Sequence, residues 1–284
     1  MSITETIKNR RSVRNYTGEA LKAEHANPIV AFISALRTPF PGKYRIELIR
    51  TNASAEPVRL GTYSVISGAS DFLALMYEPD DNLAEENAAY CFEQVVLFCT
   101  SLGLGTCWLG GTFNRSNFAA QVDLQATEIL RIVSPVGYIK NEKRLVETLI
   151  GADRHHKSRK SFSTHFYDGS FDKPLTEENA GIYREPLEML RLAPSANNRQ
   201  AWRIVLDDDN VHFYCHRASL FDFSRTDLGI ALCHFDLTCR ESGIQGSFEV
   251  LEKRRETTSG DKNRYAVTWI KSLSPLHGEK SVIS

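Results

Sequence analysis

The feature that most constrains the fold of this 284-residue chain is a weak internal repeat. "YRIEL" at 44–48 aligns with "WRIVL" at 202–206 at an offset of 158 residues, and the same offset places Ala35 on Ala193. Similar segments at a fixed offset are the signature of a repeated structural unit. We therefore expect the chain to consist of two related units.

A second alignment links the two strongest helical patterns at an offset of 140 residues. The matched pairs are Leu97 with Leu237, Cys99 with Cys239, Gly103 with Gly243, and Leu104 with Ile244. The two offsets differ by 18 residues because the first half has more residues between these landmarks. Both halves thus run in the same order: helix, turn, aromatic-Arg-Ile strand, and a long helix that ends in glycine.

The two halves differ in their polar segments. At the offset of 158, Ser195 corresponds to Arg37 and Asn198 to Phe40, so the polar turn "APSANNRQAW" is present in the second half only. Conversely, the basic stretch "RRSVR" at 10–14 has no basic counterpart ahead of the second unit. Each half has kept a segment that the other lacks.

The hydrophobic pattern predicts both helices and strands. Strands are expected over 43–51, 71–79, 129–139 and 265–271, with a hairpin at 202–216. Helices are expected over 5–13 after a cap at Ser2 or Thr4, over 27–36 with Pro28 in the first turn, and over 83–103, 184–192 and 227–243. The elements are mixed without regular βαβ alternation, which indicates an α+β fold. We place the unit boundary between 165 and 166, giving units 1–165 and 166–284.

Composition excludes several classes of partner. Lys+Arg 34 against Asp+Glu 35 gives a net charge of −1, so no overall field attracts nucleic acid or an anionic membrane. The six cysteines form no C-x-x-C pair, which favours reduced core cysteines in a cytosolic protein. No signal peptide or membrane-length apolar stretch is found. We expect a soluble cytoplasmic protein, and since the adjacent His155 and His156 lack ligand spacing, no metal site.

The stretch "RRSVR" is the strongest candidate for binding an anion. Arg10, Ser12 and Arg14 are spaced at i, i+2 and i+4, so the two arginines share a face in a helix and all three residues share one in an extended segment. Two guanidiniums and a hydroxyl suit a phosphate, because arginine presents a planar fork of donors. The alternative is a solvated basic helix start.

Two further segments carry weaker signals. "KSRK" supplies a second basic cluster, Lys157, Arg159 and Lys160, whose alternative interpretation is a charged linker. "SLGLGTCWLGG" ends in Gly110 and Gly111, whose missing Cβ atoms let backbone amides approach a flat ligand. Its alternative is a helix C-cap followed by a strand end. No nucleophile elbow, P-loop or zincin motif is present.

Together these motifs resemble the nitroreductase family of flavin mononucleotide (FMN) enzymes. The family's R-x-S-x-R/K, P-S-S/A-x-N-x-Q-P-W, G-L-G-x-C-W-x-G-G and late basic elements read here "RRSVR", "PSANNRQAW", "GLGTCWLGG" and "KSRK". The resemblance extends from about residue 7 to about residue 250. It departs from the usual order, because Ser195 follows Ser12 by 183 residues instead of closely.

The internal repeat accounts for this departure. Family members are usually intertwined homodimers with FMN at the interface, so the resemblance implies a nitroreductase-like fold in which two fused units form an intramolecular pseudo-dimer. A fused pair needs only one complete site, shared between its halves. Because the usual dimer interface is then internal, we expect a monomer.

The resemblance also implies the residues of the FMN site. They are Arg10, Ser12, Arg14, Gly110, Gly111, Lys157, Arg159, Lys160, Pro194, Ser195, Ala196 and Asn198. The first-half clamp would hold the phosphate, ribityl chain and pyrimidine edge, with phosphate contacts from "KSRK". The second-half turn would line the ring, and the two glycines would offer backbone donors near N5 and O4. Ala201 replaces the family's proline, which affects the rigidity of the turn more than its contacts.

The resemblance implies a flavin oxidoreductase with no dedicated acid or base. NADH or NADPH would give hydride to flavin N5, and an electron-poor nitroaromatic or quinone would then accept it. Cationic Arg14 would stabilise the anionic reduced flavin. Two alternatives remain open: a non-catalytic flavin-binding or storage protein, and a specialised relative that acts on flavin itself or on halogenated aromatics.

Overall fold

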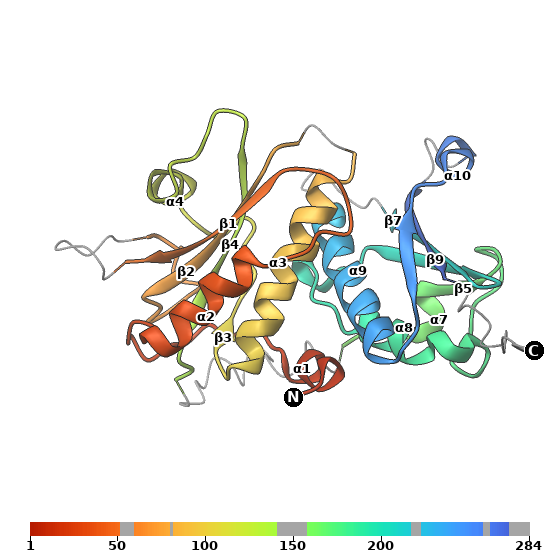
Figure 1. Cartoon of the computed structure of the whole chain (residues 1–284), viewed down its shortest axis with the longest axis horizontal. Helices are drawn as coiled ribbons and strands as arrows, with labels where there is room; N and C mark the ends of the chain where they lie inside the picture. Colours follow the sequence, from red (N-terminus) through yellow and green to blue (C-terminus); the bar gives the residue numbers. More distant parts are fainter. Residues whose placement is uncertain (52–59, 80–81, 141–157, 217–222, 258–261, 273–284) are drawn as a thin grey trace, which may run out of the picture.

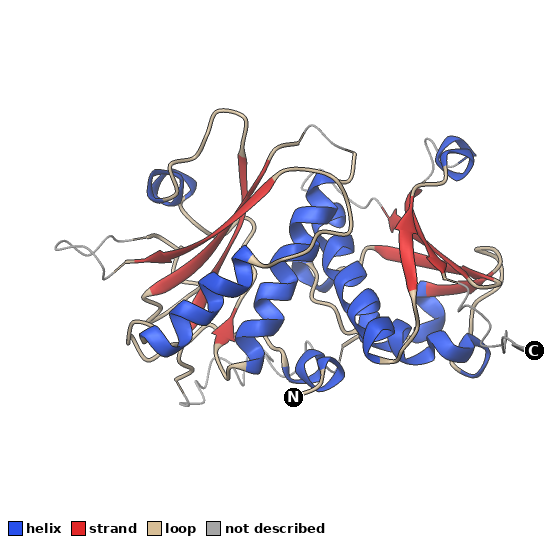
Figure 2. Cartoon of the chain, viewed as in Figure 1, coloured by secondary structure: helices blue, strands red, loops and turns tan. Residues whose placement is uncertain are grey.

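Two β-sheets lie on either side of a central pair of long helices, α3 (Ala84–Ser101) and α9 (Ser224–Glu241) (Figure 1). The computed structural model describes residues 1–51, 60–79, 82–140, 158–216, 223–257 and 262–272. Figure 2 shows helices between the sheets and beside them, so the predicted α+β class is confirmed. The helix α2 (Ala23–Ser34) packs beside α3, and α8 (Arg184–Arg191) packs beside α9.

The two sheets have the same strand order. The first contains β1 (Tyr44–Arg50), β2 (Asp71–Tyr77), β4 (Ile129–Gly137) and β3 (Gly105–Thr106), in the order β1-β2-β4-β3. The second contains β5 (Phe166–Asp168), β6 (Trp202–Asp207), β7 (Asn210–His216), β9 (Asn263–Lys271) and β8 (Gly246–Glu249), in that order. The run β6-β7-β9-β8 repeats β1-β2-β4-β3, and every pair in both runs is antiparallel. The second sheet differs by β5, which pairs with β6 in parallel.

The two central helices begin and end at aligned positions at the offset of 140. Each has 18 residues, and each ends at a glycine with positive φ, 76° at Gly103 and 74° at Gly243. The next backbone N–H closes the cap in both halves, from Leu104 to the Cys99 carbonyl at 3.0 Å and from Ile244 to the Cys239 carbonyl at 2.8 Å. This is the six-to-one hydrogen bond of a Schellman cap. The two aligned glycines are therefore explained by the same cap, which requires a positive φ at this position.

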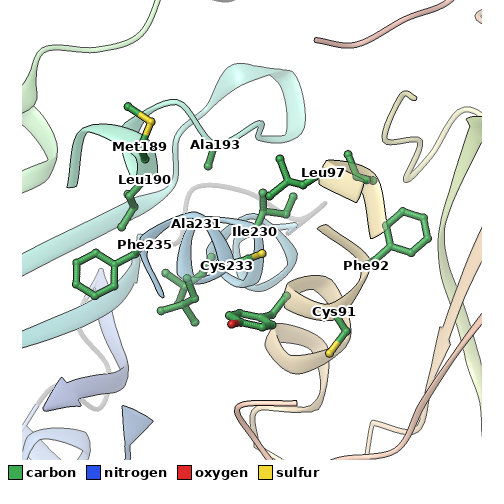
Figure 3. Packing of buried hydrophobic residues seen from close by; sticks show 14 of the residues in the cluster. Cys91, Phe92, Leu97, Met189, Leu190, Ala193, Ile230, Ala231, Cys233 and Phe235 are labelled. Atoms are coloured by element: carbon green, nitrogen blue, oxygen red, sulfur yellow. The ribbon is translucent and has the colours of Figure 1, made fainter. Parts of the chain in front are cut away.

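The core surrounds the contact between these two helices (Figure 3). α3 and α9 are buried around most of their circumference because each is covered by the other helix and by a sheet. Residues such as Phe92, Ile230 and Phe235 fill this centre with 2% exposure or less. All six cysteines are buried free thiols, as expected of core cysteines.

Three helix boundaries differ from those predicted. α1 (Ile3–Asn9) begins after a Ser2 capping box, as expected, but ends before "RRSVR". α2 begins at Ala23, so Pro28 lies inside the helix and not in its first turn. α9 begins at Ser224, three residues before the predicted start at Asp227. Polar residues at these ends carry no periodic signal, which explains the errors.

The remaining helices are short. They are α4 (Arg115–Gln121), α7 (Phe162–His165), α10 (Glu252–Thr257) and the 3-10 segments η1 (Glu178–Tyr183) and η2 (Ala196–Asn198). Residues 158–165 precede the proposed unit boundary, yet α7 packs against α8, β5 and β6 of the second half. The boundary between 165 and 166 stays a prediction.

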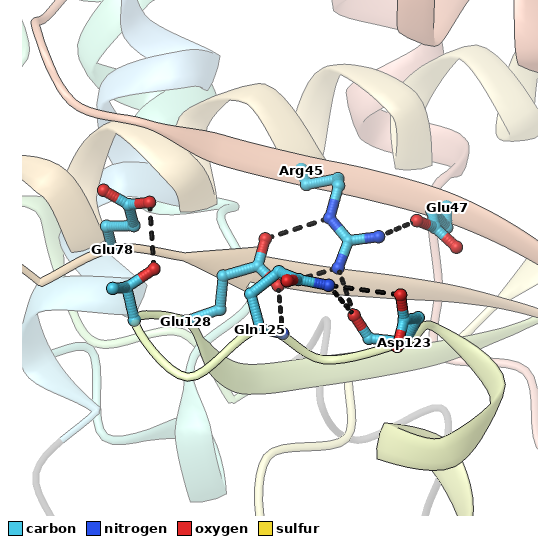
Figure 4. Close-up of polar contacts among 7 residues, drawn as sticks. Arg45, Glu47, Glu78, Asp123, Gln125 and Glu128 are labelled. Atoms are coloured by element: carbon cyan, nitrogen blue, oxygen red, sulfur yellow. Dashed lines mark hydrogen bonds and ion pairs between the residues drawn. The ribbon is translucent and has the colours of Figure 1, made fainter.

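A polar network ties the first sheet to the loop that precedes β4 (Figure 4). Arg45 of β1 donates two hydrogen bonds to Glu128, Nε to Oε1 at 2.9 Å and Nη2 to Oε2 at 2.7 Å, and also contacts Glu47. Arg45 lowers the pKa of Glu128 by this hydrogen bonding. None of these residues lines the pocket described below, so we assign the network to stability.

Candidate functional site

A pocket of about 670 Å³ opens between the two halves of the chain. Its walls include ten of the twelve predicted site residues: Arg10, Ser12, Arg14, Gly110, Gly111, Arg159, Pro194, Ser195, Ala196 and Asn198. The volume falls in the range of about 300–1,000 Å³ that is usual for small-molecule and cofactor sites. The basic stretch near the N-terminus and the polar turn, far apart in sequence, thus meet at one cavity.

The segment "RRSVR" is extended, not helical. α1 ends with Arg10 as its C-cap, and Ser12 then pairs with Thr106 of β3 in a parallel bridge. The Val13 N–H donates to the Thr106 carbonyl at 2.8 Å, and the Val13 side chain is buried. Because side chains alternate along an extended chain, Arg10, Ser12 and Arg14 face the pocket together. Of the two geometries considered for this stretch, the structure contains the extended one.

Two arginines place positive charge deep in the pocket wall. Arg10 is 4% exposed, and burial lowers its pKa. The pKa of Arg159 falls to about 10, first through burial and then through the positive charges of Arg10 and Arg191. The buried Arg159 Nε has no hydrogen-bond partner among the residues that the structure describes. A bound anion would relieve the repulsion between these guanidiniums and could accept a hydrogen bond from Arg159 Nε.

The second basic cluster contributes one residue to this wall. Arg159 donates from Nη2 to the Leu192 carbonyl at 2.9 Å and from Nη1 to Asn198 Oδ1, so it is fixed against the polar turn. Lys160 does not line the pocket, and its Nζ donates to the Arg199 carbonyl at 2.8 Å. Lys157 lies outside the described residues.

The turn "APSANNRQAW" has a strained backbone that is held by one of its own side chains and by one from α9. Asn197, Asn198 and Gln200 have φ values of 51°, 54° and 52°, in the left-handed region that costs energy for residues other than glycine. The Ser195 hydroxyl accepts from the Gln200 N–H at 2.9 Å, and Asp227 Oδ1 accepts from the Ala196 N–H at 2.9 Å. Strain of this kind persists where surrounding contacts fix the backbone, as is common at binding sites.

The glycine pair also lines the pocket. A Cβ atom on Gly110 would lie 2.5 Å from the Phe223 ring, whereas one on Gly111 would meet no atom within 4 Å. Gly110 therefore lets Phe223 pack closely, and Arg131 lies 4.4 Å above the same ring in a cation–π contact. The missing Cβ atom thus allows close packing at Gly110, whereas at Gly111 it faces open space.

Several lining residues were not predicted from the sequence. They are Arg11, Val65, Cys107, Trp108, Leu109, Thr112, Ile132, Asn197, Arg199, Ala201, His216, Phe223, Ser224, Thr226, Asp227 and Ile230. The repeat carries a usable signal for Asp227, which aligns with Asn87 at the offset of 140. Asn87 Oδ1 accepts from the Phe40 N–H at 3.3 Å, so both positions hold the turn before the sheet's first hairpin.

The described parts of the chain meet neither of two further requirements, those of a metal site and of a membrane-spanning helix. Those residues include no group of three or more His, Cys, Asp and Glu side chains placed to hold a metal ion. Among their helices, none has the length and apolar character needed to span a bilayer.

Residues 2–239 match a family model described as "Putative TM nitroreductase". A solved structure described as a putative nitroreductase from Thermotoga maritima MSB8 has a TM-score of 0.58 and 20% identity, and it covers 95% of this chain and 94% of its own. A nitroreductase with bound FMN from Bacteroides fragilis has a TM-score of 0.39 and 20% identity, covering 51% of this chain and 92% of its own. A nitroreductase family protein from Clostridium difficile has a TM-score of 0.44 and 19% identity, and it covers 58% of this chain and 96% of its own. No curated protein matches the sequence.

Proposed function

The chain belongs to the nitroreductase family, and from this premise we propose that it is an FMN-dependent oxidoreductase. It would pass hydride from NADH or NADPH to an electron-poor acceptor of the nitroaromatic or quinone type. One observation carries the proposal: the buried guanidinium of Arg10 and the partly buried one of Arg159 lie together in the wall of a cofactor-sized pocket. That arrangement suits a ligand with a phosphate at one end.

The described residues fit FMN. Arg10 and Arg159 would hold the phosphate, because their charges lie together and Arg159 Nε is a buried donor without a described partner. Ser12 and Arg14 follow along the same extended segment and would contact the ribityl chain and the pyrimidine edge. Pro194, Ser195, Ala196 and Asn198 would line the ring, opposite backbone donors from Gly110 and Gly111. Lys157 remains proposed as a further source of charge at the phosphate, whereas Lys160, which does not line the pocket, would add only a distant charge that solvent screens.

Bound FMN would supply the hydride chemistry, and the protein would supply orientation and charge. Arg14 would hold positive charge beside the pyrimidine edge, where negative charge grows on reduction. Asn198 would act chiefly by fixing Arg159, since its Oδ1 accepts from Arg159 and its Nδ2 donates to the Ser158 hydroxyl at 2.9 Å. No proton donor from the chain is required.

We also propose that the chain is a fused pair of units, 1–165 and 166–284, that behaves as a monomer with one FMN. The shared strand order, the matched central helices and the aligned caps support this proposal. The clamp comes from the first unit and the polar turn from the second, so one complete pocket needs both. The interface that two separate subunits would form around such a pocket would then be formed by the two units of one chain.

The first experiment is the visible absorption spectrum of the purified protein, with released flavin quantified per chain. The proposal expects one FMN per chain. Two would mean that the first half retains a working site, and none after reconstitution would contradict the cofactor assignment.

A second experiment tests turnover. We expect NADH or NADPH to reduce the bound flavin under anaerobic conditions, and a nitroaromatic added afterwards to reoxidise it. Reduction by neither nucleotide would contradict the proposed activity. Reduced flavin that persists after the acceptor is added would instead indicate a flavin-binding protein without turnover.

A further inference from the structure

A buried carboxylate–imidazole pair joins the two central helices behind the pocket. Glu93 of α3 and His234 of α9 are both 0% exposed, and Glu93 Oε1 lies 2.9 Å from His234 Nε2. Neither residue lines the pocket, but Glu93 reaches two that do. Its Oε2 accepts from Trp108 Nε1 at 2.8 Å, and its Oε1 lies 4.0 Å from Arg10 Nε.

The hydrogen bonds of His234 assign the charge of this pair. His234 Nδ1 lies 3.0 Å from the Met189 carbonyl oxygen, which can only accept, so Nδ1 carries a hydrogen. Nε2 faces a carboxylate oxygen at 2.9 Å, and that contact also needs a hydrogen between its atoms. Whether this proton resides on imidazole or carboxyl, Glu93 and His234 together have no net charge. The pair is therefore neutral as a unit.

Neutrality matters because Glu93 stands beside the cation of the anion clamp. An uncompensated carboxylate buried near Arg10 would form an ion pair with it and offset its charge. With His234 as partner, Glu93 fixes Trp108 and borders Arg10 at 4.0 Å, and the neutral pair offsets the charge of Arg10 less than a lone carboxylate would. We infer that His234 is a positioning residue of the site, which neutralises Glu93 so that more of the positive charge of Arg10 is left for the ligand's phosphate. This inference rests on the proposed FMN function.

The pair also breaks the match between the two helices. At the offset of 140, Glu93 aligns with Cys233, and Gln94 aligns with His234. Each helix thus contributes one member of a pair that has no copy at the aligned positions. The asymmetry lies beside Trp108 and Arg10, on the side where the pocket is open.

The test compares FMN with riboflavin, which lacks the phosphate. In the full-length variant H234Q, the glutamine amide can still donate to Glu93 but carries no charge, so the carboxylate is left uncompensated. We expect its affinity for FMN, measured by equilibrium dialysis, to fall about tenfold, the scale of one buried charge acting on another. Its affinity for riboflavin should change by less than about twofold, because the ring and ribityl contacts are intact.

Two further variants separate charge from folding. In E93Q/H234Q the uncompensated carboxylate is gone, so FMN affinity should return to within about threefold of wild type, a rescue that a merely structural role would not produce. H212Q is the matched control, because His212 of β7 is 2% exposed and does not line the pocket. Its FMN affinity should match wild type.

The outcomes distinguish this inference from the proposed function. Wild-type protein that binds FMN, with H234Q binding it equally well, would overturn the inference alone. A loss in H234Q that applies equally to riboflavin, or that E93Q/H234Q fails to rescue, would also overturn it, because the effect would then not be one of charge. Wild-type protein that binds neither flavin would overturn the proposed function and the inference with it.

Discussion

The turns that precede β1 and β6 are each anchored by the first turn of a central helix but have different surroundings. Asp227 of α9 accepts from the Ala196 N–H, and Asn87 of α3 accepts from the Phe40 N–H. Beyond this shared contact, the second-half turn borders an open pocket. In the first half, Phe40 is 6% exposed, and its ring centroid lies 5.1 Å from that of Phe248.

The two anchored N–H groups differ by two positions, because Ala196 aligns with Thr38 at the offset of 158, but the side chains that follow can be compared directly. Phe40 aligns with Asn198, and Phe248 aligns with the pocket residue Trp108. An aromatic residue thus stands after both helices, but only in the first half does a second ring from the turn pack on it. At this aligned position the Phe40 ring fills the space beside the aromatic residue, whereas Asn198 borders an open pocket. The side chain at this position therefore decides whether the space is filled or open.

The largest expected effect comes from removing the buried ring of Phe40. F40A should lower the free energy of unfolding by about 3–5 kcal/mol, because it leaves a cavity beside Phe248. N198A, the change at the aligned position, should cost only about 1 kcal/mol, since it removes hydrogen bonds next to an open pocket. Urea denaturation of both variants measures the difference. Equal losses of unfolding free energy in F40A and N198A would show that the two side chains contribute equally to stability, and would contradict the comparison.

The next effect concerns the pocket end. R159A should weaken FMN binding by about 2 kcal/mol, because it removes a partly buried cation of the pocket wall and the donor that fixes Asn198. K160A is the matched control from the same basic cluster, since Lys160 does not line the pocket. Its FMN affinity should change by less than about twofold. An equal loss in K160A would mean that the cluster acts only through its summed charge.

Much of this arrangement was predictable because the repeat and the hydrophobic pattern are long-range signals. They located the paired strands and both central helices, and the resemblance brought Arg10 and Ser195 to one site. The strands β3, β5 and β8 have only two to four residues, too few for a periodic pattern. Glu93 and His234 were missed because each is an ordinary helical position until the helices pack.

A smaller effect tests where the two halves agree. G103A and G243A should each cost about 1 kcal/mol, because alanine in the left-handed region is strained, and no atom lies within 4 Å of either added Cβ. Backbone conformation is then the only cause, and it is the same in both caps. Costs that differ by more than about 0.5 kcal/mol in urea denaturation would show that the helix ends are not equivalent.

The smallest effect separates two arginines that the repeat aligns, Arg45 of β1 and Arg203 of β6. Arg45 is paired with Glu128, whereas Arg203 donates to the Trp202 carbonyl at 2.6 Å, and burial lowers its pKa. Because the folded pKa of Glu128 is depressed, its stabilisation is present above the unfolded value of about 4.3 and is lost as pH falls through the lower folded value.

R45A should therefore remove up to about 1 kcal/mol of unfolding free energy at pH 7, a surface-pair magnitude, and less below pH ~4. Arg203 forms no ion pair with a carboxylate among the described residues, so the cost of R203A should not shrink over the same acidic range. Urea denaturation at several pH values measures both. If the cost of R45A stayed constant with pH, the Glu128 pairing would not be the source of its stabilisation, and the two aligned arginines would differ in burial alone.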